Sequence, residues 1–155
     1  MQYKPRAVRV ADQLRADYGI TEPPINAGLI IYDYPLRVVL QDWNDDISGV
    51  FVRGRVLSYI GLNKNHPEER RNFTLWHEFY HFLEHGDVYL CEYGGRLNSD
   101  LLEQEADMFA ANLLMPREWV VDYFERFAGS VPRLAKRFGV SSTAMRFRLK
   151  RLGLG

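Results

Sequence analysis

The chain has 155 residues, a length that suits one compact domain with a real hydrophobic core and excludes two full catalytic domains. Basic and acidic residues number 20 each, so the formal net charge is zero, and with 46% hydrophobic residues the chain is neither disordered nor a polycation that coats nucleic acid. Cys91 is the single cysteine, which excludes an intrachain disulfide framework. Because no signal-peptide pattern or long apolar run is visible, we expect a cytoplasmic protein that does not contact membranes.

The first part of the chain predicts one helix followed by a small sheet. Apolar residues at helical spacing predict a helix over 5–18. Three runs rich in β-branched and aromatic residues follow at 29–40, 47–52 and 55–60, and the last two are close enough in sequence to form a hairpin. We therefore expect a small, largely antiparallel sheet of three strands.

The rest of the chain predicts helices. Pro67 suits the first turn of a long helix over 67–85, and a second helix runs from about 99 to 114, where Pro116 follows. Shorter helical segments continue to residue 152. The expected fold class is therefore α+β.

The long helix carries one face of histidine and glutamate. Its apolar residues fall on the opposite half of the helical wheel. A polar face that only meets water usually contains lysine or arginine, yet neither occurs between Asn72 and Gly95. The local charge therefore favours a bound cation over a simple solvated surface.

Three residues of this face form an HExxH pattern, namely His77, Glu78 and His81. Two imidazoles one helical turn apart can reach one zinc ion, and the adjacent glutamate is placed to activate water. His85 lies about 12 Å from His77 along the axis at roughly 1.5 Å per residue, so it cannot join them on one ion. A third ligand must come from elsewhere in the chain.

An acidic segment in the next helix, residues 103–107, supplies candidates for that ligand. Helical-wheel geometry leaves both Glu103 and Glu105 open, because each borders the apolar stripe of its helix. A ligating histidine also needs an acceptor for its second ring N–H, and Asp107 or Glu84 is a candidate for that role.

Three segments of the chain resemble the ImmA/IrrE-type zinc metallopeptidases, and they occur in the order typical of that family. They are RNFTLWHEFYHFLEH at 71–85, EADMFAANLLMP at 105–116, and LAKRFGVSSTAMRFRLKRLG at 134–153. Three positions depart from the family pattern: Trp76 replaces an alanine, and Phe79 and Tyr80 replace leucine and glycine. If these large rings lined the cleft, they would narrow it.

The resemblance implies a cytoplasmic zinc metalloendopeptidase with a gluzincin-like site. His77 and His81 would bind zinc, Glu105 would be the third ligand, and Glu78 would be the catalytic base. Relatives act as antirepressors that cleave a helix-turn-helix transcriptional repressor and release stress, phage or mobile-element genes. A repressor of this kind is therefore the expected protein partner.

The resemblance also implies a domain organisation. We expect a zinc metallopeptidase domain over 1–128, in which the small sheet packs with a helical zincin-like core. A basic helix-turn-helix-like segment over 129–155 would follow and pack on the same domain. The sequence predicts no particular oligomeric state.

The basic end of the chain supports a second class of function. Residues 130–155 contain seven basic residues and no acidic ones. The net charge of zero therefore arises because the positive charge of this end balances the negative charge of the rest of the chain. Gly139 suits the turn of a helix-turn-helix, Ser141 or Ser142 suits the next N-cap, and Arg148 falls where a core residue is expected. The alternative function is a DNA-binding or repressor-sequestering regulator with a weakly catalytic or inactive metal site, although the sequence favours a protein partner over DNA.

Overall fold

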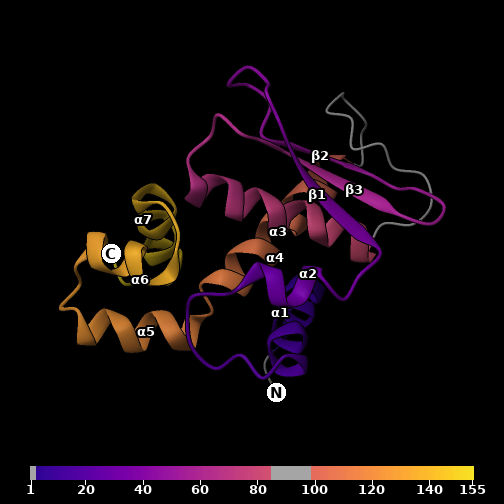
Figure 1. Ribbon diagram of the computed structural model, residues 1–155. Helices are drawn as coiled ribbons and strands as arrows, with labels where there is room; N and C mark the ends of the chain where they lie inside the picture. The colour runs from indigo at the N-terminus through magenta and orange to yellow at the C-terminus, as the bar shows by residue number, and fades with distance from the viewer. Residues whose placement is uncertain (1–2, 85–98) are drawn as a thin grey trace. The chain divides into compact units, whose positions relative to one another are not determined.

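The computed structural model describes residues 3–84 and 99–155 (Figure 1). The elements in chain order are α1 (Arg6–Asp17), α2 (Ala27–Ile31), β1 (Leu36–Gln41), β2 (Gly49–Val52), β3 (Ser58–Asn63), α3 (Glu68–Glu84), α4 (Ser99–Leu114), α5 (Arg117–Arg126), α6 (Val131–Phe138) and α7 (Ser142–Arg151). The predicted α+β class is confirmed. Predicted residue His85 lies outside the described residues, and no helix within them is long and apolar enough to cross a membrane.

The chain forms two compact units. One comprises Asn26–Ala110 and contains the sheet, while the other combines Met1–Ile25 with Ala111–Gly155. The domain boundary at residue 128 stays a prediction.

The sheet of the first unit has the order β1-β3-β2, with β3 in the centre. β2 and β3 form the predicted antiparallel pair. β1, however, runs parallel to β3, with Leu36 opposite Ser58 and Gln41 opposite Asn63. The sheet is therefore mixed, and the prediction of a largely antiparallel sheet is wrong.

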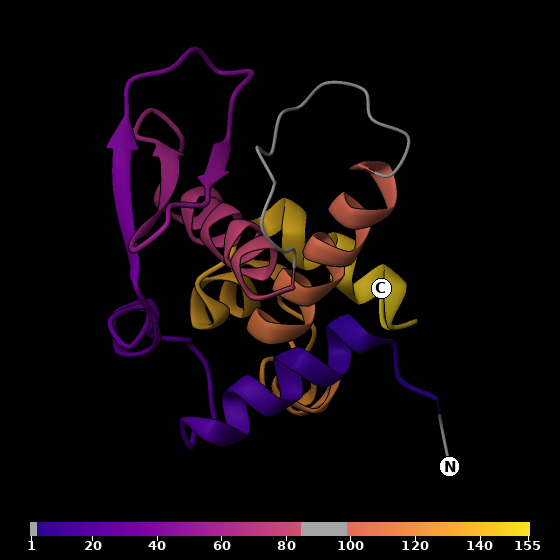
Figure 2. The same ribbon diagram turned by 90° about the vertical axis from the view of Figure 1, so that its right-hand side faces the viewer.

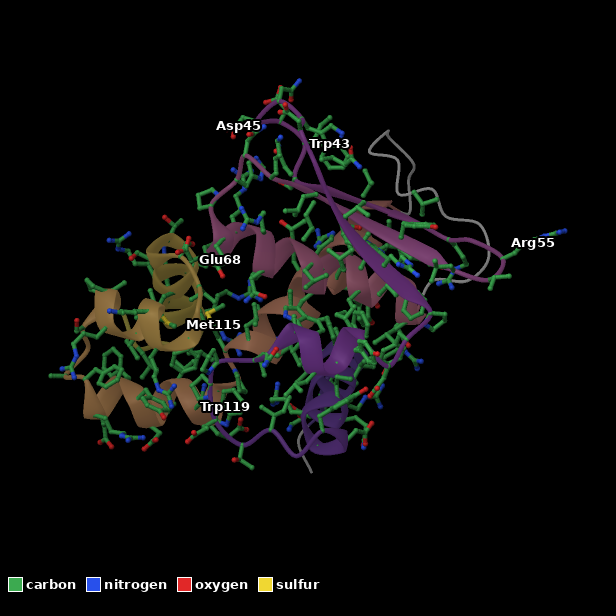
Figure 3. All side chains as sticks on the ribbon, viewed as in Figure 1. Trp43, Asp45, Arg55, Glu68, Met115 and Trp119 are labelled. Atoms are coloured by element: carbon green, nitrogen blue, oxygen red, sulfur yellow. The ribbon has the colours of Figure 1, made fainter. Side chains whose placement is uncertain are left out.

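The connection between β1 and β2 explains this topology. The chain leaves β1 at the end of the sheet where β3 also ends, and residues 42–48 cross that end to enter β2 (Trp43 and Asp45 mark this connection in Figure 3). Fully buried Asn63, the last residue of β3, holds the crossing segment: its Nδ2 donates to the carbonyls of Asn44 and Ile47, each at 2.8 Å. A buried amide that must find partners thus fixes the path of the loop.

The predicted strand over 29–40 is only partly correct. Residues 27–31 form the short helix α2, and the strand begins at Leu36. Asn26 is the N-cap of α2, because its side chain accepts a hydrogen bond from the backbone N–H of Gly28 at 3.0 Å. A short apolar run suits a buried helix as well as a strand, so its local pattern does not decide between them.

Helix α3 lies between the sheet and α4 (Figure 2). Its large residues Trp76, Phe79 and Tyr80 are fully buried. The Phe79 ring meets the rings of Tyr34 and Trp76 edge-on at 5.1 and 5.2 Å between centroids, and Tyr80 stacks on Phe109 at 5.0 Å. The residues that depart from the family pattern are thus accommodated in the core of this unit, where aromatic packing stabilises α3.

In the second unit, two arginines bind the C-terminal end of α4. Arg15 of α1 donates to the carbonyl of Asn112 at 2.6 Å, and Arg148 of α7 donates to the carbonyl of Met115 at 2.9 Å. Burial lowers the pKa of Arg148 to about 10, which leaves it protonated at neutral pH. Arg148 thus stands where the sequence predicts a core residue, and its role there is to cap carbonyls at the end of α4 that lack a partner within the helix.

The segment joining α6 and α7 contains the predicted turn glycine and serine N-cap. Gly139 ends α6 in the left-handed conformation with φ of 70°, which a residue with a side chain rarely adopts. Ser141 then caps α7, since its hydroxyl accepts a hydrogen bond from the Ala144 N–H at 3.0 Å. The predictions for Gly139 and Ser141 are confirmed.

Candidate metal centre

Helices α3 and α4 bring two histidines and one glutamate to a single point. His77 Nε2 lies 2.7 Å from Glu103 Oε2, and His81 Nε2 lies 2.8 Å from Glu103 Oε1. The candidate ligand atoms of these three residues all lie within 4.8 Å of one another. Two rings from one helix and a carboxylate from the next thus form a group that could hold one metal ion.

The local structure of α3 explains why the two rings face the same way. His77 and His81 are one helical turn apart, and their ring centroids are 5.1 Å apart. Their side chains are 12% and 3% exposed, whereas the Glu103 side chain is 48% exposed. The centre therefore has two shielded nitrogen donors and one oxygen donor that water can reach.

Asp107 orients the first of the rings. It lies one turn after Glu103 on α4, and the Nδ1–H of His77 donates to Asp107 Oδ1 at 2.7 Å. The prediction that Asp107 accepts a histidine ring N–H is confirmed. This contact directs His77 Nε2 toward the centre and makes the ring a better electron-pair donor.

Glu105 is not part of this group. It is a half-buried residue two positions beyond Glu103, which corresponds to a rotation of about 200° around the helix. The four-residue interval between Glu103 and Asp107 is the sequence signal that favours Glu103, because it places both carboxylates on one face of α4.

The charges of the metal-free centre favour a bound cation. Burial of the His77 ring acts to lower its pKa, but the hydrogen bonds to Asp107 and Glu103 and the nearby charge of Glu78 outweigh it and raise the pKa of His77 to about 10. Burial likewise acts to raise the pKa of Glu103, yet hydrogen bonds from His77 and His81 hold it well below its usual value. The surroundings of His77 and Glu103 therefore stabilise a positive charge, as a metal site requires.

Glu78 is a buried residue between the two histidines in sequence, and β2 packs closely against it. A Cβ atom added at Gly49 would lie 2.6 Å from Thr74 Cγ2 and 3.5 Å from Glu78 Cγ. Only glycine therefore permits β2 to approach α3 this closely. The strand restricts the space around the Glu78 side chain, which keeps its carboxylate near His77.

The donor set fits a catalytic metal ion. Two imidazole nitrogens and one carboxylate oxygen are a ligand set found in catalytic zinc sites, where three protein ligands leave a further position for water or substrate. Together with a buried glutamate beside the first histidine, these features make the group a candidate metal centre of the metallopeptidase kind.

Comparison with known proteins identifies the family. Residues 38–150 match the family model Peptidase_M78, described as the IrrE N-terminal-like domain, and the chain belongs to this ImmA/IrrE-type family. Over 98 residues it is 36% identical to the radiation response metalloprotease IrrE of Deinococcus deserti, an alignment that covers 58% of this chain and 35% of that protein.

A solved structure shares the fold. The structure titled Mycobacterium tuberculosis transcriptional regulator superimposes with a TM-score of 0.69 and 16% identity, covering 95% of this chain and 47% of that one. The chain thus spans about a third of the length of IrrE and about half of the length of the regulator.

Proposed function

We propose that the chain is a zinc-dependent endopeptidase in which His77, His81 and Glu103 hold the metal. The convergence of both histidine rings on the Glu103 carboxylate carries the proposal. It assigns the third ligand to Glu103 in place of Glu105. Membership of a peptidase family and similarity to a metalloprotease support the activity.

Each residue of the centre has a separate task in this proposal. When bound, zinc would supply a Lewis acid that polarises the scissile carbonyl and lowers the pKa of water. The Glu78 carboxylate accepts a proton from the attacking water and then delivers it to the nitrogen of the departing amine. Asp107 keeps His77 in the tautomer that presents Nε2 to the metal, and it needs no change of protonation to do so.

The edge strand β2 suggests how a peptide is held. Within the residues that the structure describes, β2 pairs only with β3, and β2 packs against α3 at Thr74 and Glu78. An extended segment of substrate would pair with β2 as an added strand, which would place a peptide bond near Glu78. The backbone would then provide affinity while side-chain fit selects the cleavage site.

The substrate we propose is a helix-turn-helix transcriptional repressor, cleaved in the cytoplasm to release the genes that it controls. The similar proteins support a role in regulation, since one is titled a radiation response metalloprotease and the other a transcriptional regulator. The repressor encoded next to the gene for this protein is the first substrate to test.

Incubation of the zinc-loaded protein with that repressor tests the proposal, with fragments detected by mass spectrometry. Glu78→Gln should retain zinc and lose cleavage, because it keeps the ligands and removes the base. His77→Ala should lose both zinc and cleavage. Undiminished cleavage by the Glu78 variant would refute the mechanism, and tight binding of an intact repressor by the zinc-loaded protein would favour a sequestering function instead.

A further inference from the structure

The outer face of α7 is basic with an aromatic residue at its centre. Four exposed residues lie along it at helical spacing, namely Thr143, Arg146, Phe147 and Lys150. Phe147 is 65% exposed, which is unusual for a phenylalanine, while Met145 and Leu149 on the opposite face are buried. The helix is therefore held firmly by one face and presents the other to solvent.

Three other basic residues of this segment have structural roles. Arg148 caps α4, Arg137 donates to Tyr123 Oη at 3.0 Å, and the Arg133 guanidinium stacks 4.3 Å from the centre of the Phe127 ring. By contrast, Arg146 and Lys150 are exposed, and residues 130–155 contain no acidic residue. Their charges are therefore available to an anionic partner.

The geometry of α6 and α7 suits insertion of α7 into a groove. α6 ends at Gly139 and α7 begins at Ser142, so the two helices are joined by the short turn typical of helix-turn-helix motifs. With 10 residues, α7 is about 15 Å long, and the major groove of DNA, about 12 Å wide, admits a helix of this kind.

We propose that the exposed face of α7 binds duplex DNA in the major groove. The Arg146 guanidinium can donate two hydrogen bonds to a guanine edge, Lys150 can contact a flanking phosphate, and Phe147 can pack on a thymine methyl group. An acidic protein would match the charge alone, whereas DNA uses both features of the face: phosphates for the cations and an apolar base edge for the ring. This binding is independent of the metal centre.

Fluorescence anisotropy of a labelled mixed-sequence duplex with the full chain tests the proposal over a range of salt concentrations. Affinity should fall as salt rises. Combined Arg146→Ala and Lys150→Ala should weaken binding by about tenfold or more, because the guanine contact and the phosphate contact are both lost. The salt slope should fall by roughly 1, because only Lys150 contacts a phosphate. Phe147→Ala should reduce the preference for DNA sequences selected for tight binding over random sequences. Glu78→Gln should bind DNA like the unaltered chain.

A matched control removes the same charge elsewhere. Arg9 and Arg55 are exposed residues outside α7, and Arg55 points away from the sheet (Figure 3). Their combined replacement by alanine should leave DNA binding nearly unchanged. Equal weakening by both double variants, or no binding of the duplex at low salt, would overturn the proposal. Binding of polyglutamate as tightly as the duplex, with the same dependence on Arg146, would assign the face to an acidic protein and also overturn it.

Discussion

Exchange of Glu103 for glutamine changes the centre with little change in volume. The side-chain oxygens of Glu103 lie 2.7 Å from His77 Nε2 and 2.8 Å from His81 Nε2, so this carboxylate faces both rings. Glutamine keeps one oxygen as a weak neutral donor but removes the negative charge. Glu105→Gln makes the same chemical change two residues away, outside the group of candidate ligands, and is therefore the matched control.

The magnitude follows from the number of ligands. Structural zinc sites with four protein ligands bind with about 10–16 kcal/mol, or about 2.5–4 kcal/mol per ligand. Complete loss of one ligand would weaken binding by roughly 100- to 1,000-fold. Because glutamine retains an oxygen, we expect about 100-fold for Glu103→Gln and no more than about threefold for Glu105→Gln.

Competition with a chromophoric chelator at constant pH measures both affinities. Thermal unfolding of the metal-free variants shows whether either exchange disturbs the fold, which is needed because Glu103 also bonds to both histidines. If Glu105→Gln lost about 100-fold in zinc affinity while Glu103→Gln bound zinc like the unaltered chain, the ligand assignment would be wrong.

Three further predictions follow from the same geometry. Asp107→Asn should lower zinc affinity by about 10- to 100-fold, because the His77 ring loses its charged acceptor. Exposed Asp122→Asn is the control in the same chelator assay. Equal zinc affinities for both variants would contradict the role of Asp107 in orienting His77. Since the pKa of His77 is about 10 without metal, zinc binding at pH 7 should release close to one proton from this ring, and zinc affinity should rise as pH rises toward 10. Calorimetry in buffers of different ionisation enthalpy measures the number of protons released. A binding enthalpy that is the same in every buffer would refute the release of a proton. Gly49→Ala should destabilise the fold by about 1–3 kcal/mol in urea unfolding, because its Cβ would lie 2.6 Å from Thr74 Cγ2; an unchanged midpoint would show that α3 can move away from the strand.

Local sequence determined the longer helices and two of the three residues of the centre, His77 and His81. Periodic apolar residues, with Pro67 at the start, predicted a helix over 67–85, and α3 runs from Glu68 to Glu84. The same short-range chemistry identified Gly139 as the residue that ends α6. Such features depend on neighbours within about one helical turn, so the sequence contains all the information that they require.

Tertiary structure decided which residues meet across elements. The parallel pairing of β1 with β3 depends on Asn63 holding a loop that is distant in sequence, and no local pattern contains that contact. The contact of Glu103, and not of Glu105, with the two histidines depends on the rotation of α4 about its axis, which packing of its apolar face against α3 sets. Each residue turns a helix by about 100°, and the helical wheel of α4 alone leaves both Glu103 and Glu105 as candidates. Only the position of the partner helix shows which of the two faces the histidines.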